Sequence, residues 1–453
     1  MRLDAPTFLP VVKLGGAQSG LFEYQRLVRI LRGTIGDLAA WGMGEFCWPS
    51  ACSGFRAHAK VTKIGKRIVH NRLVPVKAND PQSPYRTPRA SPLKAPSLGQ
   101  LRQYAIARSL FKPTTLPRAI ARLGFVQADP MRAPARAQDL ILALRVKDYR
   151  AGDLERRYPR LAIEEAFFIN YGFLPRETLA LLYPRAAPRA WDARMQARAQ
   201  EVLAFVRQHG RTRPKDMRAH FDHGRIQRWG GDLNASTHLL EGLHYCGLLR
   251  VARREAGTRV YQAIEYPPQD DSPEARLARA GQLLDVVVQL YAPLPAASLG
   301  YLCGLLRYGV PQLATETRQV LEHAKSRYAH AHVDGLLWFW PEGEKPMAAP
   351  NPIDDRLRFL APFDPVVWDR RRFQMFWGWE YKLEAYVPAH KRRMGYYAMP
   401  MLWGEQMPGW ANLKVVDGRL QHELGFVGPR PRGSVFQLAL DEALQQMREF
   451  LEL

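Results

Sequence analysis

The spacing of apolar residues changes along the chain, and from residue 97 onward it predicts regular elements. Apolar side chains three and four residues apart are typical of helices, whereas strict alternation is typical of strands. Residues 97–190 follow the helical spacing except at one short strand, so we expect a mainly helical first unit. Its predicted elements are the strand Phe125–Asp129 and the helices Leu98–Phe111, Leu116–Leu123, Leu154–Phe168 and Leu174–Leu182.

Residues 191–270 have the clearest local pattern. Three helical segments are followed by two strand-like runs joined across Glu255-Ala256-Gly257. This order predicts a winged helix, a helix-turn-helix variant with a β-hairpin wing. Winged helices bind DNA or other proteins, and the many arginines favour DNA. The predicted elements are the helices Glu201–His209, Arg213–Phe221 and Ser236–Tyr245 and the strands Leu248–Arg253 and Arg259–Ile264.

The remaining pattern divides into two parts. Residues 271–350 loosely repeat three helices and a strand, Leu336–Trp340, which predicts a third, degenerate winged helix. Residues 351–453 contain short runs rich in aromatic and aliphatic residues between Pro and Gly, which predict a small β-domain resembling a barrel. The closing segment Phe436–Leu453 is an amphipathic helix that we expect to pack on this domain.

The charge of the chain predicts a polyanionic partner. The net charge is +22 and the isoelectric point is near 10.0. Residues 1–96 lack a clean periodicity and hold 15 Lys and Arg against 5 Asp and Glu, so we expect a disordered basic extension there. The rest of the chain keeps +12. This excess favours DNA over an anionic membrane surface.

Cysteine usage and hydropathy indicate the compartment. Cys47, Cys52, Cys246 and Cys303 are scattered, without the spacing of a disulfide framework or a zinc finger. The chain has no apolar run of about 18 residues and no signal-peptide pattern. We therefore predict a protein of the reducing cytoplasm, associated with the nucleoid. Because no coiled-coil repeat is present, a monomer is the expected state.

Candidate chemistry lies on the predicted strand Phe125–Asp129. Side chains alternate along a strand, so Gln127 and Asp129 should project from one face and present an amide beside a carboxylate. Pro130 and Pro134 limit how the chain leaves the strand. Spacing alone favours a simpler interpretation, in which Asp129 caps the following turn.

Four motifs, in a fixed order along the chain, favour a functional role for Gln127-Ala128-Asp129. They are L-G-F-V-Q-A-D, then E-G-L-H-Y-C-G-L-L with V-A-R-R-E-A-G-T-R-V-Y, then L-A-P-F-D-P-V-V-W-D-R-R-R, and W-E-Y-K-L-E-A-Y-V-P-A-H-K-R-R-M-G-Y-Y-A-M-P. Over about residues 98–420 the chain thereby resembles the YcaQ/AlkZ family of crosslink-repair DNA glycosylases. The resemblance implies three tandem winged helices on a curved DNA-binding surface. Together with the apolar pattern it predicts an α+β fold, mainly α, with winged-helix units at 97–190, 191–270 and 271–350 and a β-barrel-like domain at 351–453.

The resemblance also implies an activity. Family members remove alkylated purines, particularly N7-alkylguanine, and unhook DNA interstrand crosslinks. Gln127-Ala128-Asp129 matches the Gln/Asp form of the family's catalytic motif. Breaking the N-glycosidic bond gives the sugar oxocarbenium character, which a carboxylate stabilises while it deprotonates a water. Asp129 is the candidate for this role, and Gln127 the candidate for positioning the water.

The cationic leaving base makes a metal or organic cofactor unnecessary. No lysine lies beside the motif, which predicts a monofunctional enzyme that leaves an abasic site. The predicted partner is double-stranded DNA with alkylated or crosslinked bases. A crosslinked guanine is tethered to the opposite strand, so we expect an open, basic cleft in place of the enclosed pocket used in base flipping.

Phosphate contacts are expected from basic and polar residues in two regions. The candidates are Arg225, Arg228, Ser236 and His238 around the third helix of the second unit, Arg253 and Arg254 in its wing, and Lys391, Arg392 and Arg393 in the C-terminal domain. For each residue taken singly, a solvated surface charge is the simpler interpretation. The exception is the cluster 391–393, which Tyr386, Tyr396 and Tyr397 flank.

Two departures from the family pattern bear on the substrate range. Many members carry His after the R-A that follows the catalytic strand, whereas this chain has Gln138. The usual W-A-H-like segment is replaced by Phe168-Ile169-Asn170-Tyr171. The rival hypothesis is therefore a noncatalytic winged-helix DNA-binding regulator, in which Gln127 and Asp129 are structural.

Overall fold

The computed structural model describes residues 95–185, 191–221, 224–228, 231–348 and 354–453. The extension predicted at 1–96 lies outside this part of the chain, apart from its last two residues. The first helix, α2 (Leu98–Ser109), begins at a capping box. Ser97 Oγ accepts a hydrogen bond from Gln100 N at 3.2 Å, and Gln100 Oε1 accepts one from Ser97 N at 2.8 Å.

The first region contains more strand than predicted. Its elements after α2 are α3 (Leu116–Leu123), β1 (Val126–Gln127), α4 (Ala137–Ala143), α5 (Asp153–Arg157), a 3-10 turn (Tyr158–Arg160), β2 (Ile163–Phe167), β3 (Tyr171–Pro175) and α6 (Arg176–Ala180). The single helix predicted at Leu154–Phe168 is wrong. Pro159 lies within it and cannot continue a helix, so the chain passes through the 3-10 turn into β2.

The three strands of this region form one small antiparallel sheet in the order β1-β3-β2. Val126 pairs with Phe173 and Gln127 with Gly172. A Cβ atom at Gly172 would lie 2.3 Å from the carbonyl oxygen of Val126, so glycine permits this close approach of β3 to β1. The sheet therefore holds β1 from one side, while α4 contacts it as well.

The second region has the predicted order of three helices followed by a hairpin. Its elements are α7 (Ala193–His209), α8 (Pro214–His220), β4 (Arg225–Arg228), β5 (Gly231–Asn234), α9 (Ala235–Cys246), β6 (Leu249–Glu255) and β7 (Thr258–Ala263). The short β4–β5 hairpin was not predicted. Ala256 and Gly257 both have positive φ, 46° and 83°, which suits the tight turn between β6 and β7.

The third region adds a second three-stranded sheet. Its elements are α10 (Pro273–Tyr291), β8 (Leu294–Pro295), α11 (Ala296–Leu305), two 3-10 turns (Leu306–Tyr308 and Pro311–Leu313), α12 (Ala314–Glu322), α13 (Ala324–Arg327), β9 (Ala329–Val333) and β10 (Leu336–Trp340). The predicted strand Leu336–Trp340 is confirmed as β10. It is the central strand of the order β8-β10-β9.

The C-terminal region contains an open sheet. Its elements are β11 (Leu357–Phe359), α14 (Pro365–Trp368), α15 (Arg370–Trp377), a 3-10 turn (Ala389–Lys391), β12 (Met399–Trp403), β13 (Gln406–Val416), β14 (Arg419–Phe426) and α16 (Ser434–Leu451). The antiparallel order is β11-β12-β13-β14, and no pairing joins β14 to β11 among the described residues. The predicted barrel-like closure is therefore not found, whereas the closing helix is confirmed and contacts β11.

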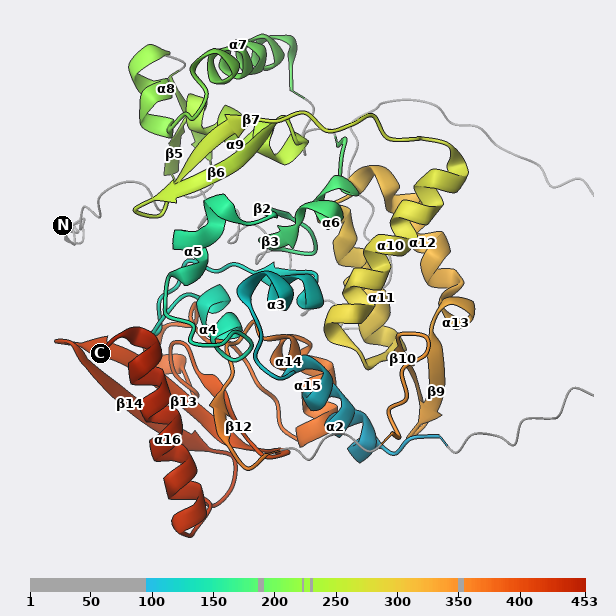
Figure 1. Cartoon of the computed structure of the whole chain (residues 1–453), viewed down its shortest axis with the longest axis vertical. Coiled ribbons are helices and arrows are strands. Elements are labelled where there is room, and N and C mark those ends of the chain that lie inside the picture. Colours follow the sequence, from blue (N-terminus) through green and yellow to red (C-terminus); the bar gives the residue numbers. More distant parts are fainter. Residues whose placement is uncertain (1–94, 186–190, 222–223, 229–230, 349–353) are drawn as a thin grey trace, which may run out of the picture. The chain divides into compact units, whose positions relative to one another are not determined.

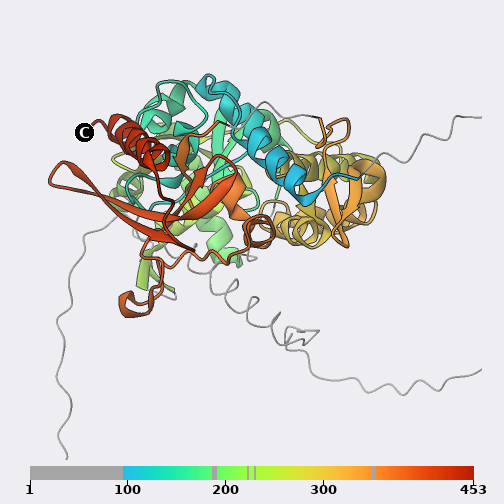
Figure 2. The same ribbon diagram turned by 90° about the horizontal axis from the view of Figure 1, so that it is seen from below.

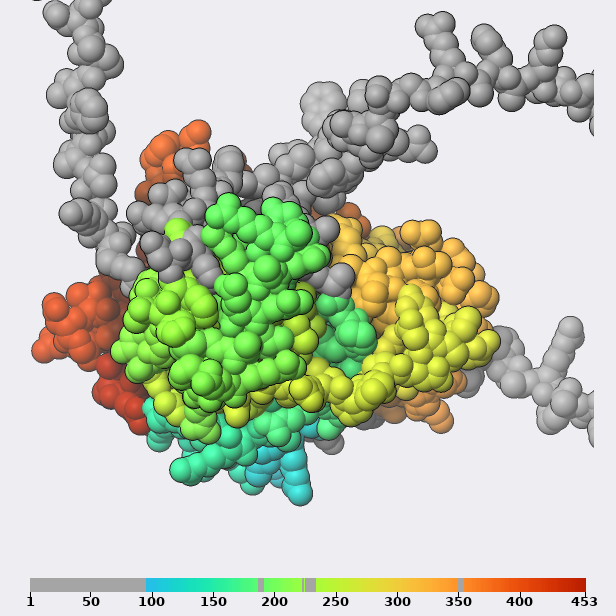
Figure 3. All heavy atoms as spheres, turned by 90° about the horizontal axis from the view of Figure 1, so that it is seen from above, coloured from blue at the N-terminus to red at the C-terminus, as the bar shows by residue number. Residues whose placement is uncertain are grey.

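Helices and strands from distant parts of the sequence pack together (Figure 1). Helix α2 contacts α10, α14 and α15, so the start of the described chain lies against its C-terminal region. Figure 2 shows α16 beside the C-terminal sheet and the long β13–β14 hairpin extending past the other strands. In Figure 3 the second region, in green, covers the near face, and the yellow segment that leads to α10 runs away from it to one side.

Candidate active site

Strand β1 carries the predicted catalytic motif into the interior of the protein. Gly124 ends α3 with a φ of 71°, a left-handed conformation that suits glycine. Beyond it, Gln127 and Asp129 are only 3% and 4% exposed. The strand is shorter than predicted and ends at Gln127. Asp129 therefore lies just past the strand, where the chain turns toward α4.

The Gln127 side chain contacts a residue from the far end of the sequence. Trp368 Nε1 donates a hydrogen bond to Gln127 Oε1 over 2.8 Å. Trp368 is the last residue of α14, and its ring is tilted against that of Tyr291 with 5.3 Å between centroids. No local pattern in the sequence indicates this contact. The two residues do lie in two of the four motifs, L-G-F-V-Q-A-D and L-A-P-F-D-P-V-V-W-D-R-R-R.

A buried ion pair explains how Trp368 reaches the motif. Arg145 follows α4, Asp364 precedes α14, and both side chains are completely buried. Arg145 Nη1 donates to Asp364 Oδ2 at 2.8 Å, and Arg145 Nη2 donates to Asp364 Oδ1 at 3.0 Å. Two parallel bonds of this kind fix orientation as well as distance. Asp364 Oδ1 also accepts from Val366 N, so the same carboxylate caps the helix that ends at Trp368.

Asp129 makes the turn contact that its spacing predicted. Its Oδ1 accepts a hydrogen bond from the backbone nitrogen of Met131 at 2.9 Å, as in an Asx-turn. Its own backbone nitrogen donates to Gln138 Oε1 at 3.1 Å. Gln138 occupies the position where many family members carry His, so the replaced residue lies directly at the motif.

Tyr397 lies in a different environment from the one its sequence position suggests. We expected it to flank a surface cluster, but it is 2% exposed. Burial, and then the charge of Asp129, raise the pKa of Tyr397 well above its usual range. Its hydroxyl has no hydrogen-bond partner among the described residues. A buried phenol without a partner beside a carboxylate is unusual, because most buried polar groups are hydrogen-bonded.

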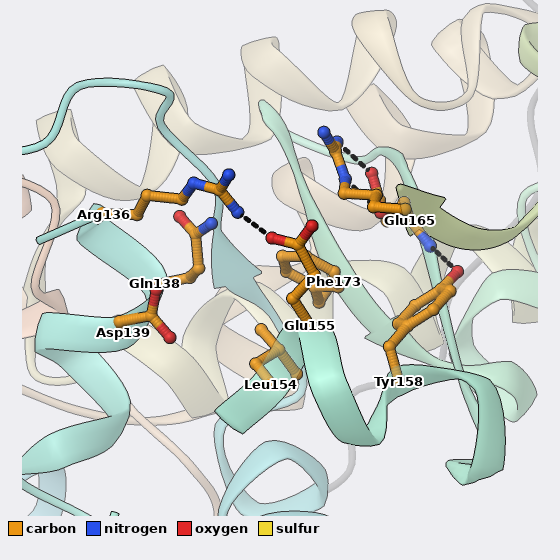
Figure 4. Close-up of a pocket in the computed structure, with 9 residues that line it drawn as sticks. Arg136, Gln138, Asp139, Leu154, Glu155, Tyr158, Glu165 and Phe173 are labelled. Atoms are coloured by element: carbon orange, nitrogen blue, oxygen red, sulfur yellow. Dashed lines mark hydrogen bonds and ion pairs between the residues drawn. The ribbon is translucent and has the colours of Figure 1, made fainter. Parts of the chain in front are cut away.

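A small charged hollow lies on the other side of Gln138 (Figure 4). Gln138 is placed between Arg136, which forms an ion pair with Glu155, and Asp139. Asp139 is buried, and this burial raises the pKa of its carboxyl group although Tyr149 donates a hydrogen bond to it at 2.7 Å. The hollow has room for little more than a water molecule and no obvious fit to a nucleobase.

Two acidic residues of β2 form ion pairs with arginines of the β6–β7 hairpin. Glu164 accepts from Arg250 Nε at 2.9 Å. Glu165 accepts from Arg254 Nε at 2.8 Å and Nη2 at 2.5 Å, and from Tyr171 Oη at 2.7 Å. Burial acts to raise the pKa of Glu165, but Arg254, together with Arg259 and Tyr171, outweighs it and the pKa falls to about 2. These contacts join the hairpin to the sheet that carries β1.

The predicted DNA contacts of the second region have varied environments. Arg253 is paired with Glu255, Nη2 to Oε1, at 2.6 Å. Arg254 is held by Glu165, and Ser236 is completely buried at the start of α9, so neither offers a free surface group. His238 is partly exposed. Arg225 and Arg228 lie on β4, but their side chains are outside the described part of the structure.

The C-terminal cluster faces outward. We use the name basic loop for residues 384–396, of which Lys391, Arg393 and Tyr396 are exposed. Among the described residues no carboxylate pairs with the Lys391 or Arg393 side chain. Arg392 donates to the carbonyl oxygen of Val387 at 2.8 Å and lies over the Tyr396 ring at 5.1 Å.

One buried carboxylate holds the basic loop. Glu384 Oε2 accepts hydrogen bonds from the backbone nitrogens of Arg393 at 2.8 Å, Met394 at 2.7 Å and Gly395 at 3.3 Å. Gly395 has a φ of 109°, which allows the turn that points three successive N–H groups at one oxygen. Because the acid binds backbone, the exposed side chains of Lys391 and Arg393 remain available to a ligand.

The arrangement is that of a known class of DNA-repair protein. The structure is similar to Streptomyces sahachiroi DNA glycosylase AlkZ, with a TM-score of 0.51 and 15% sequence identity, over 78% of this chain and 96% of that one. At this identity the likeness concerns the fold. A family model described as DNA glycosylase AlkZ-like matches residues 120–450. The chain therefore belongs to the AlkZ-like family of DNA glycosylases, as its motifs predicted. No helix among the described residues is long and apolar enough to cross a membrane.

Proposed function

We propose that this protein is a monofunctional DNA glycosylase that hydrolyses the N-glycosidic bond of N7-alkylated purines in duplex DNA. The observation that supports this most directly is the burial of Gln127 and Asp129, the motif pair, with the Gln127 amide hydrogen-bonded to Trp368. Membership of a DNA glycosylase family supports the same reaction class.

In the proposed reaction, a water oxygen forms a bond to the sugar C1′ while the bond from C1′ to the purine N9 breaks. The bonding electron pair passes to the base, whose positive charge it neutralises, and a proton of the water passes to Asp129. The Asp129 carboxylate also stabilises the cationic sugar. Gln127 positions the water. The alkylated base is its own good leaving group, so the reaction needs no metal or organic cofactor.

DNA binding is assigned chiefly to the basic loop. Lys391 and Arg393 are exposed, and Tyr396 beside them presents an aromatic face. Lysine and arginine bind phosphates along either strand without reading sequence. We also include His238 and Arg253 as secondary contacts, and we propose that the helical regions 97–190, 191–270 and 271–350 are winged-helix units. Unhooking of interstrand crosslinks is a further proposed activity of the same site, and the cell interior is the proposed location.

A specific observation favours the rival function, a noncatalytic DNA-binding regulator. Both motif side chains have structural partners, since Asp129 Oδ1 accepts from Met131 N and Gln127 Oε1 accepts from Trp368 Nε1. A measurement of base release decides between the two functions.

The decisive experiment follows base release from duplex DNA containing N7-methylguanine, and in parallel from a crosslinked duplex. We expect Asp129→Asn to lower the single-turnover rate by about 10²- to 10⁴-fold, the usual contribution of a general base, with DNA affinity retained. Asp334→Asn, in the turn between β9 and β10, is the control and should keep the wild-type rate. DNA binding by the wild type without release of either base would establish the rival function.

A further inference from the structure

The amide orientation of Gln127 is determined by the chemistry of its neighbour. An indole nitrogen can donate a hydrogen bond but cannot accept one. The Gln127 atom that lies 2.8 Å from Trp368 Nε1 must therefore be the amide oxygen. The opposite assignment would place two donors against each other. The amide nitrogen of Gln127 consequently points away from Trp368.

Trp368 is itself held firmly, so it can act as a fixed reference. Its backbone nitrogen donates to Asp364 O at 2.8 Å, in the short helix that the Asp364 side chain caps. Its ring lies 5.3 Å from that of Tyr291 and 6.3 Å from that of Tyr301, and the side chain is buried. The terminal torsion of glutamine is otherwise broad and roughly two-fold. Without the indole N–H, both amide orientations become accessible.

The other end of the amide carries donor hydrogens only. Among the described residues, no hydrogen bond joins Gln127 Nε2 to a protein acceptor. We infer that Trp368 is a positioning residue that presents Gln127 to the reacting groups as a hydrogen-bond donor. The inference rests on the proposed function and adds the polarity of Gln127, which the motif by itself leaves open.

A donor at this position has a definite role in the hydrolysis. A water molecule has two hydrogens and two lone pairs. If Asp129 takes one hydrogen and Gln127 Nε2 donates to one lone pair, the second lone pair is left for C1′. An accepting amide would bind the other hydrogen and would leave the direction of attack less restricted. Gln127 therefore orients the water, and Trp368 orients Gln127.

The first test compares two tryptophans that each donate one indole hydrogen bond. Trp368→Phe removes the bond to Gln127, and we expect base release from N7-methylguanine DNA to slow by about 3- to 10-fold, the effect of one neutral hydrogen bond. Trp379→Phe is the matched control, because Trp379 is similarly buried and donates to Met407 O at 3.1 Å. In the Gln127→Ala background, Trp368→Phe should have no further effect. An equal loss in both tryptophan variants, or a loss that persists without Gln127, would overturn the inference.

The second test examines polarity. At a pH where its carboxyl group is ionised, Gln127→Glu can still accept from Trp368 but cannot donate, so its rate there should fall as far as that of Gln127→Ala. Wild-type activity in Gln127→Glu would show that the residue acts as an acceptor.

A measurement without catalysis separates this inference from the proposed function. The nitrogen-15 signal of the Trp368 indole, assigned by its disappearance in Trp368→Phe, should shift in Gln127→Leu while the Trp379 signal stays in place. If the wild type released no base, the proposed function would fail, and the spectrum would still report the orientation of the amide. An unmoved Trp368 signal would overturn the inference in either case.

Discussion

Two arginine-containing segments, the β6–β7 hairpin and the basic loop, differ in what the nearby carboxylates bind. In the hairpin, Glu165 binds the guanidinium of Arg254 with both oxygens, and Glu255 binds Arg253. In the basic loop, Glu384 binds three backbone N–H groups and, within the described part of the chain, pairs with no basic side chain. An arginine therefore joins two regions of the protein in the hairpin, where Arg254 binds Glu165, whereas in the basic loop Arg393 remains exposed.

The difference indicates that the position of the acidic residues, more than the number of arginines, determines which basic side chains are available to contact DNA. A guanidinium that forms two hydrogen bonds to a buried carboxylate would have to break them before it could bind a phosphate. Breaking a buried ion pair costs much free energy. An exposed lysine without a partner incurs no such cost. We therefore divide the predicted basic contacts whose side chains are described into structural and available groups by their acidic neighbours.

The largest effect that the comparison predicts is on stability. Arg254→Ala would leave the buried Glu165 carboxylate without its main partner, and we expect the free energy of unfolding to fall by about 3–5 kcal/mol. Urea denaturation followed by circular dichroism measures this change. Arg253→Ala is the neighbouring control, because its partner Glu255 is far more exposed, and it should change the free energy by at most about 1 kcal/mol. Similar losses in both variants would contradict the distinction between the two arginines.

A second prediction concerns pH. The folded protein lowers the pKa of Glu165 from 4.5 to about 2, so the ionised form is favoured by folding. This stabilisation is fully present above the unfolded pKa and is lost as the pH falls through the folded pKa. Between pH 6 and pH 3, the free energy of unfolding should therefore fall by about 2 kcal/mol more in the wild type than in Glu165→Gln. Equal pH dependence in the two proteins would mean that the ion pair does not favour the ionised carboxylate.

Local patterns in the sequence were sufficient for several elements but not for their contacts. The order of helices and hairpin in the second region, the strand Leu336–Trp340 and the closing helix are confirmed, because each depends on periodicity within a short segment. The helix predicted at Leu154–Phe168 failed because Pro159 and the pairing of β2 with β3 outweighed helical spacing. The barrel failed because closure depends on how the end strands meet, which residue types do not specify.

The candidate site shows the same division. The motif Gln127-Ala128-Asp129 was available from the resemblance, and its Asp129 turn contact from local spacing. The roles of Trp368 and Tyr397 could not be predicted from the sequence, because they depend on segments more than 200 residues apart. The approach of Trp368 to the motif follows from the buried ion pair between Arg145 and Asp364. Such a pair is invisible in a sequence because each partner alone resembles an ordinary surface charge.

The smallest predicted effect is on DNA affinity, and it compares a basic residue of the basic loop with one of the β6–β7 hairpin. Lys391→Ala removes an exposed cation that has no acidic partner among the residues the structure describes, so we expect the affinity for duplex DNA to fall by several-fold and the salt slope to decrease by about one. Arg253→Ala should change both quantities less, because Glu255 already neutralises that guanidinium.

Fluorescence anisotropy at several salt concentrations measures the affinity and the slope together. Lys382→Ala is the control for a loss of charge near the basic loop, since Lys382 is paired with Glu380 at 2.9 Å, and it should behave like Arg253→Ala. If Arg253→Ala lowered the slope as much as Lys391→Ala, an acidic partner would not decide which basic residues bind phosphate. The hairpin would then belong to the DNA-binding surface together with the basic loop.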